Sequence, residues 1–317
     1  LEFLEERMQK IEILRIESLS RAPLVVEGYL FEGSDPTASS IAIIGAMEGD
    51  SILPLYCASS LVDFFKNKIE EKKIKGNVLI IPSINHYALN IGKRFWPLDN
   101  TDLNMMFPGY ELGETTQRIA KKVFDAISGY TYGIMLERRP DPATCIPYIK
   151  LFKSGYEDLK AAKKFGFKMI HHRTVKSIDT VSLQYNWQLW GTKAFSIMCP
   201  HENQIDKKTS SQINQGILRF MDKNKIIEHH IFNGYESTVI NRESIEVVKS
   251  PKSGIFIQSE LAGSYVSKDQ VIGEVVHSLE GNLIHTFLAP CDGMITCFYS
   301  NSLIYENAVA FRIAKIG

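Results

Sequence analysis

The sequence predicts an α/β fold in which a mainly parallel, mixed sheet lies between helices and a small β unit follows it. Short apolar runs, typical of strands buried on both faces, alternate with segments of helical spacing from Ile41 to Asn224. After about Phe232 the chain changes to short strands separated by glycine-containing turns, and this last part repeats itself. We therefore expect two units, residues 1–232 and residues 233–317.

The elements of the large unit follow in order. Its first segment, LEFLEERMQKIEIL, is charged and helix-forming, and PLVVEGYLF then alternates as a strand does. Buried strands are expected at Ile41–Met47, Gly76–Asn85 and Gly133–Leu136, and further strands near Phe167–His171 and at Lys193–Cys199. Helices are expected at about Pro54–Lys73, Glu111–Ile127, Tyr156–Phe165, Thr180–Trp190 and Thr209–Asn224. In open sheets of this kind ligands bind at the carboxyl ends of the strands, which here are GAMEGDS, IPSINHYALN, MLERRPDP and IMCPHENQ.

The C-terminal unit contains two similar halves. SPKSGIF resembles APCDGMI, and GSYVSKDQVIGEV resembles NSLIYENAVAFRI, which predicts a small pseudo-symmetric β barrel or sandwich of the lipoyl-domain type. Lipoyl domains carry their cofactor on a lysine in the hairpin between the halves, but the corresponding HSLEGNLIHT contains no lysine. We therefore expect a structural or oligomerisation role for this unit.

The overall composition limits the possible partners. Lys plus Arg and Asp plus Glu both number 36, so no net field attracts nucleic acid or an anionic membrane surface. No apolar run approaches the roughly 20 residues that a membrane-spanning helix needs. The five cysteines are scattered and odd in number, which argues against a disulfide framework and fits a reducing cytoplasm. We expect a cytoplasmic protein that binds a small molecule, and homo-oligomer formation stays open.

The loop PSINHYALNIGKRFWPLDNTDLNMMFPG carries the most specific motif. Asn85 is followed by Arg94, then by Asp-Leu-Asn ending at Asn104, then by Phe-Pro-Gly. This spacing resembles the succinylglutamate desuccinylase/aspartoacylase family, whose members have Asn-Pro, Arg, Asp-Leu-Asn-Arg and Phe-Pro-Gly. The resemblance covers nearly the whole chain. It implies a zinc-carboxypeptidase-like fold, hydrolysis of an amide in an N-acyl amino acid, and substrate binding by Arg94 and Asn104.

The family's site is similar to that of zinc carboxypeptidases, with three protein ligands, an open zinc position and a glutamate as general base. In this sequence Glu48 and Ser51 occupy the positions of the first histidine and the glutamate ligand, and Glu137 occupies that of the second histidine. Met198 stands at the general-base position, and Met105 replaces the arginine of Asp-Leu-Asn-Arg. The zinc that the resemblance implies is therefore not expected to bind, and we describe the metal centre as degenerate.

Three interpretations of the two glutamates stay open. In the first, Glu48 and Glu137 bind a metal together with Asp50 or His201, and carboxylates would favour magnesium, calcium or manganese. In the second, they pair with the cationic group of a ligand, because two converging carboxylates without a metal need a counter-charge.

In the third interpretation, both glutamates are ordinary loop carboxylates satisfied by Arg138, Arg139 or Lys93. His201 and Glu202 are weak acid/base candidates, and a solvent-facing loop explains them equally well. The sequence thus indicates a deacylase-family protein with a pocket for an amino-acid-like or N-acyl amino acid ligand. It leaves open an amide hydrolase with a carboxylate-rich metal site and a non-catalytic binding or regulatory protein.

Overall fold

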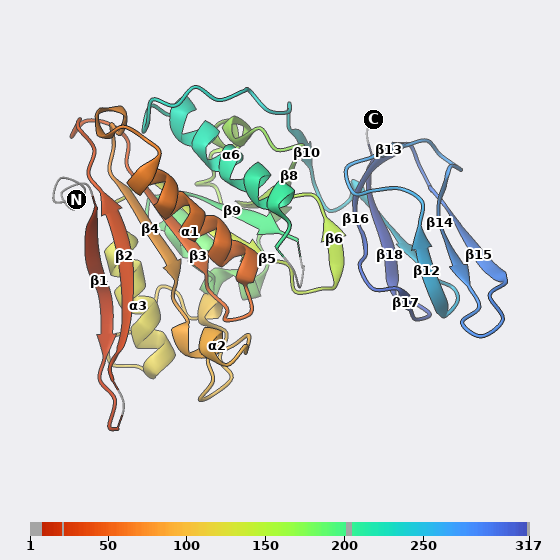
Figure 1. Cartoon of the computed structure of the whole chain (residues 1–317), viewed down its shortest axis with the longest axis horizontal. Helices are drawn as coiled ribbons and strands as arrows, with labels where there is room; N and C mark the ends of the chain where they lie inside the picture. The colour runs from red at the N-terminus through yellow and green to blue at the C-terminus, as the bar shows by residue number, and fades with distance from the viewer. Residues whose placement is uncertain (1–7, 21, 201–204, 316–317) are drawn as a thin grey trace.

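A computed structural model describes residues 8–20, 22–200 and 205–315, and its centre is a nine-stranded mixed sheet (Figure 1). Across the sheet the strands are β1 (Gln9–Ile16), β2 (Leu24–Phe31), β4 (Val78–Ser83), β3 (Ile41–Ala46), β5 (Tyr132–Arg138), β9 (Lys193–Cys199), β7 (Tyr148–Lys153), β8 (Met169–Thr174) and β10 (Thr238–Ile240). Strands β4, β3, β5 and β9 are mutually parallel, so their carboxyl ends meet at one edge. Strands β7, β8 and β10 run in the opposite direction, because β7 pairs antiparallel with β9.

Helices cover both faces of this sheet. Helices α1 (Ile52–Asn67) and α6 (Lys207–Lys223) pack on the face that receives Ile41 and Ile43 of β3. Helices α3 (Thr115–Ile127) and α5 (Leu183–Leu189) pack on the face that receives Ala42 and Ile44. The alternation of a fully buried strand thus fills two separate cores, and the loops at its carboxyl end are left to form a site. The shorter helices are α2 (His86–Asn90), α4 (Leu159–Ala162), η2 (Glu71–Lys73), η3 (Leu103–Met105), η4 (Lys163–Phe165) and η5 (Ser177–Val181).

Several expected elements differ from the structure. The segment expected to favour a helix at the N-terminus contains strand β1, which pairs with β2, and pairing to a sheet edge overrides helix propensity here. The helix expected at Tyr156–Phe165 is only the short α4 and η4. Strand β7 is an addition that the sequence patterns did not indicate. None of the helices within the described residues is long and apolar enough to span a bilayer.

The C-terminal part forms two antiparallel sheets, as its short strands and glycine-containing turns predicted. One contains β11 (Ile245–Lys249), β18 (Val309–Lys315), β16 (Gly293–Tyr299) and β13 (Tyr265–Val266), with β6 (Ala143–Cys145) added beside β16. The other contains β15 (Leu283–Leu288), β14 (Val271–Val276), β12 (Gly254–Gln258) and β17 (Leu303–Ile304). The rings of Phe256, Phe287 and Phe311 contact one another in the core between these two sheets.

The two parts of the chain exchange strands. Strand β10 belongs to the nine-stranded sheet although it follows residue 232, and β6 from the large part pairs with β16 of the C-terminal sheet. Figure 1 shows β6 reaching from the large sheet toward the C-terminal strands. The sheets are therefore joined by backbone hydrogen bonds as well as by side-chain packing.

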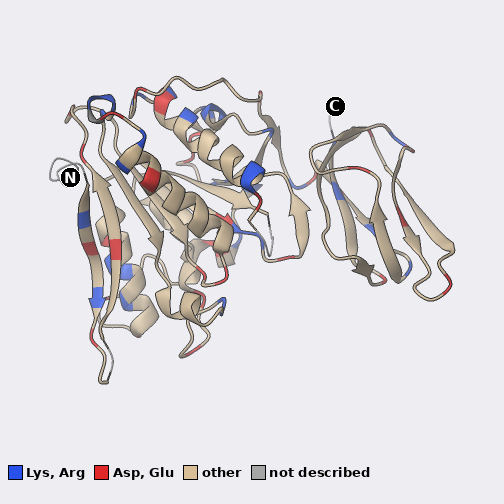
Figure 2. Ribbon diagram, in the orientation of Figure 1, with Lys and Arg blue, Asp and Glu red and all other residues tan. Residues whose placement is uncertain are grey.

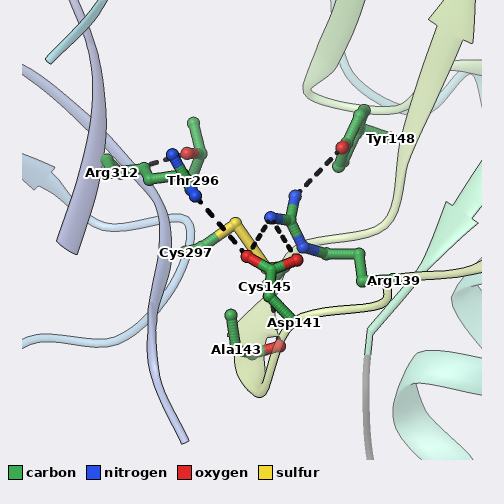
Figure 3. Close-up of a disulfide and its surroundings, with 8 residues drawn as sticks. All are labelled: Arg139, Asp141, Ala143, Cys145, Tyr148, Thr296, Cys297 and Arg312. Carbon is green, nitrogen blue, oxygen red and sulfur yellow. Dashed lines mark hydrogen bonds and ion pairs between the residues drawn. A yellow bond between two sulfur atoms is a disulfide. The ribbon is translucent and has the colours of Figure 1, made fainter. Parts of the chain in front are cut away.

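A disulfide joins Cys145 of β6 to Cys297 of β16 (Figure 3). The scattered, odd-numbered cysteines argued against a disulfide framework, and this single bond was not predicted. The two residues are 152 positions apart, and they become neighbours only because they are register partners across the β6–β16 pair. The expectation of a reducing compartment stays a prediction.

Candidate functional site

The loop after β3 places Glu48 at the carboxyl edge of the sheet, and Glu48 is only 7% exposed there. Ser51, the residue before α1, donates its hydroxyl to Glu48 Oε2 instead of capping the helix. Arg94 Nη2 lies 3.6 Å from Glu48 Oε1. Gly49 allows the motif loop to pack closely against the loop after β3, because a Cβ at this position would lie 2.2 Å from the carbonyl carbon of Ala88. The backbone N–H of Gly49 donates a hydrogen bond to the Arg94 carbonyl.

Burial is the main influence on the Glu48 carboxyl, and it raises the pKa of Glu48 to about 7. The hydrogen bond from Ser51 and the positive charge of Arg94 oppose this shift, while the negative charges of Glu137 and Asp102 add to it. The structure thus brings Glu48, Arg94 and Glu137 within electrostatic reach of one another. A carboxyl with this pKa exchanges a proton near neutral pH.

Glu137, the second glutamate, lies on the next strand of the sheet, β5. Its Oε2 accepts a hydrogen bond from Lys150 Nζ, and both side chains are largely buried, at 19% and 15% exposed. Lys150 comes from β7, where it is the register partner of Ser196 on β9. Sequence reasoning missed Lys150, because YIKLFK does not alternate strictly between apolar and polar residues and so did not indicate the strand that carries it.

Asn104 is buried, and its observed side-chain contact is structural. Its Oδ1 accepts a hydrogen bond from the backbone N–H of Leu183 at 3.2 Å, which fixes the start of α5. Asp102 caps the short η3 turn by accepting from the Asn104 N–H, and burial raises the pKa of Asp102. The substrate-binding role that the resemblance assigns to Asn104 stays a prediction.

Met198, which the resemblance places at the general-base position, has a buried side chain. Met198 is the register partner of Glu137 on one side and of Tyr148 on the other, and it packs in an apolar cluster. A thioether cannot take up a proton from water at neutral pH. His201 and Glu202, the weak acid/base candidates, lie outside the described residues.

The neighbouring basic residues have other contacts. Arg138 Nη1 donates to Asp50 Oδ2 at 2.8 Å, and Arg139 binds Asp141 through both carboxylate oxygens. Within the described ranges, the cations that contact the two glutamates are Arg94 and Lys150.

These residues do not fit a zinc ion. Among the described residues, no group of three or more His, Cys, Asp or Glu side chains is arranged to hold a metal. Zinc sites in proteins draw on imidazole, thiolate and carboxylate, whereas here Glu48 contacts a guanidinium and a hydroxyl, and Glu137 contacts an ammonium.

Comparison with known proteins confirms the resemblance seen in the motif loop. Residues 37–136 match the succinylglutamate desuccinylase/aspartoacylase catalytic domain. The N-alpha-acetyl-L-2,4-diaminobutyric acid deacetylase of Halomonas elongata is 29% identical over 111 residues, which are 35% of this chain and 30% of that enzyme. The chain therefore aligns with less than a third of the length of this relative.

Solved structures extend the likeness in fold to nearly the whole chain. A succinylglutamate desuccinylase/aspartoacylase from Rhodobacter sphaeroides has a TM-score of 0.74 at 15% identity, covering 98% of this chain and 95% of that one. The product-bound ectoine utilization protein EutE (DoeB) from Ruegeria pomeroyi also has a TM-score of 0.74, at 14% identity, covering 98% and 99%. At these identities the likeness concerns the fold alone.

Proposed function

We propose that this protein binds an amino-acid-like or N-acyl amino acid ligand and that it does so without a catalytic zinc. The proposal starts from the similarity of residues 37–136 to the succinylglutamate desuccinylase/aspartoacylase catalytic domain. The binding residues in this proposal are Glu48, Arg94, Asn104 and Glu137. The proposal includes a zinc-carboxypeptidase-like topology for the large unit and a lipoyl-type barrel-sandwich for the C-terminal unit.

The observation that carries the proposal is the hydrogen bonding of Arg94. Its Nε is buried and has no hydrogen-bond partner among the described residues, and its Nη2 is 3.6 Å from Glu48, too far for a good hydrogen bond. A buried guanidinium donor without a partner is costly, and a ligand carboxylate would satisfy it with two parallel hydrogen bonds.

The two glutamates suit the other end of such a ligand. An amine or amide N–H of the ligand would donate to Glu48 or Glu137, whose charges repel each other in the absence of a cation. Lys150 offsets this repulsion at Glu137. An amino acid derivative, with a carboxylate next to an N–H group, carries both complementary features.

The alternative is an amide hydrolase with a carboxylate-rich metal site. That function would require a metal ion to displace Arg94 from Glu48 and Lys150 from Glu137. It would also require a general base other than Met198, whose thioether cannot accept a proton from water. A binding or regulatory protein derived from the hydrolase needs neither change.

Calorimetry and thermal unfolding with amino acids and their N-acetyl derivatives test the proposal. Saturable binding should stabilise the wild-type protein, as mass action requires for a ligand of the folded state. Arg94→Gln should weaken that binding at least about tenfold, which corresponds to about 1.4 kcal/mol. Lys93→Gln, at an exposed neighbouring position, removes the same charge and should leave the affinity unchanged.

Elemental analysis separates this proposal from its alternative. About one zinc per chain in the purified protein, lost together with N-acyl amino acid hydrolysis in Glu48→Ala or Glu137→Ala, would establish the hydrolase instead. Equal affinities in the Arg94→Gln and Lys93→Gln variants would remove Arg94 from the binding site.

A further inference from the structure

A cavity of about 600 Å³ lies between the large sheet and the C-terminal sheet. Its walls come from β8, from the connection that follows β10, and from strands β11, β16 and β18. Glu48, Arg94, Asn104 and Glu137 do not line it. The cavity therefore has a lining of its own, although it borders the site proposed above, since Glu137 acts electrostatically on Tyr148 and Lys150 acts on His171. The ligand proposed below for the cavity does not depend on the function proposed above.

The lining of this cavity is strongly basic. Acidic and basic residues are otherwise interspersed along the chain (Figure 2), whereas Glu243 is the one acidic side chain among the described lining residues. The basic lining residues are Arg139, Arg173, Lys176, Arg242 and Arg312, together with His171 and His172.

Neighbouring carboxylates offset only part of this charge. Asp141 is shared by two guanidinium groups, at 2.7 Å from Arg139 and 3.5 Å from Arg312, as Figure 3 shows beside the disulfide. Arg173 pairs with Asp179, and His172 Nε2 lies 3.1 Å from Glu157 Oε1. Lys176 and Arg242, which are exposed at the rim, form no ion pair with any described residue.

One residue that lines the cavity offers a hydrogen-bonding group without a partner among the described residues. The Nε2 atom of His171 is buried and has no hydrogen-bond partner in the described part of the chain. Burial, followed by the charges of Arg173, Arg139 and Lys150, lowers the pKa of His171 to about 4, so the ring is neutral at pH 7. A neutral imidazole can donate one hydrogen bond to a ligand oxygen, and a buried polar atom without a partner is costly.

We propose that this cavity is a binding site for a small anion with at least two negative charges, carried by carboxylate or phosphate groups. Its volume is in the range of small-molecule sites. Planar guanidinium groups bind such oxyanions with two parallel hydrogen bonds. Of the five cationic side chains around the space, Lys176 and Arg242 form no ion pair with any described residue. Because the walls come from both sheets, the bound anion stabilises their packing against each other.

Isothermal titration calorimetry and thermal unfolding with pyrophosphate and with citrate test this site. Saturable binding of at least one of them, weakening as ionic strength rises, is the expected result for the wild-type protein. The double variant Lys176→Gln/Arg242→Gln should lose at least about tenfold in affinity for that anion. Both residues are exposed, so this variant should fold normally.

The matched control is Lys249→Gln/Lys268→Gln, which removes two exposed positive charges outside the cavity and should keep wild-type affinity. Binding of citrate alone would identify a carboxylate ligand, and binding of pyrophosphate alone a phosphate ligand. Equal losses in both double variants would mean unspecific attraction and would overturn the proposal, as would the absence of saturable binding of either anion. Loss of anion binding in Arg94→Gln, with the rim variant unaffected, would instead assign the anion to the other site.

Discussion

Replacing Glu48 by glutamine should change how the stability of the protein depends on pH. The pKa of Glu48 rises from 4.5 in the unfolded chain to about 7 in the folded one, mainly because the carboxyl is buried. Between these values the folded state binds a proton that the unfolded state has released. The free energy of unfolding of the wild-type protein therefore falls as pH rises through this window.

The size of the effect depends on the shift. One pKa unit corresponds to about 1.4 kcal/mol, so the wild-type protein loses up to about 3 kcal/mol between pH 4.5 and pH 8 through this group. The amide of Glu48→Gln carries no charge at any of these pH values and avoids that loss. Relative to the wild type, the variant should become progressively more stable from pH 5 to pH 8.

Urea unfolding at pH 5, 6, 7 and 8 measures this difference directly. The control variant is Glu236→Gln, at an exposed position, which should differ from the wild type by the same small amount at every pH. A difference between Glu48→Gln and the wild type that stays constant from pH 5 to pH 8 would refute the reasoning. It would show that Arg94 and Ser51 keep Glu48 ionised throughout.

Three further predictions concern the framework of the site. Lys150→Met should destabilise the protein by about 3 kcal/mol in urea unfolding, because it leaves the largely buried Glu137 without its cation. Adding Glu137→Gln should recover part of this loss, whereas additive losses would show that the two residues are not coupled. Gly133→Ala should cost about 1–3 kcal/mol, because the new Cβ would lie 2.8 Å from the ring of Trp187; an unchanged unfolding midpoint would contradict this contact. Cys297→Ser opens the disulfide across a separation of 152 residues, for which chain entropy predicts a loss of about 5 kcal/mol, and equal stability of the oxidised and reduced wild type would argue against it.

The buried strands were predictable because their signal is local. Ile41–Ala46 and Val78–Ser83 are continuous apolar runs, and such runs are buried on both faces wherever they lie in a parallel sheet. The motif loop was also readable, because its spacing survives where individual residues have changed. Local patterns were therefore sufficient for the class of the fold, the presence of a C-terminal β part and the placement of Glu48 and Glu137 at strand ends.

The partners of those residues depend on how the whole chain packs. Lys150 reaches Glu137 because β7 enters the sheet antiparallel beside β9, and nothing in the local sequence specifies which strand becomes the neighbour of another. The Cys145–Cys297 bond likewise depends on the pairing of β6 with β16. The basic cavity has the same origin, since its walls come from segments that meet only when the two sheets pack. Patterns along the chain report the environment of each residue, whereas charge pairing and cavities depend on distances that only the folded chain sets.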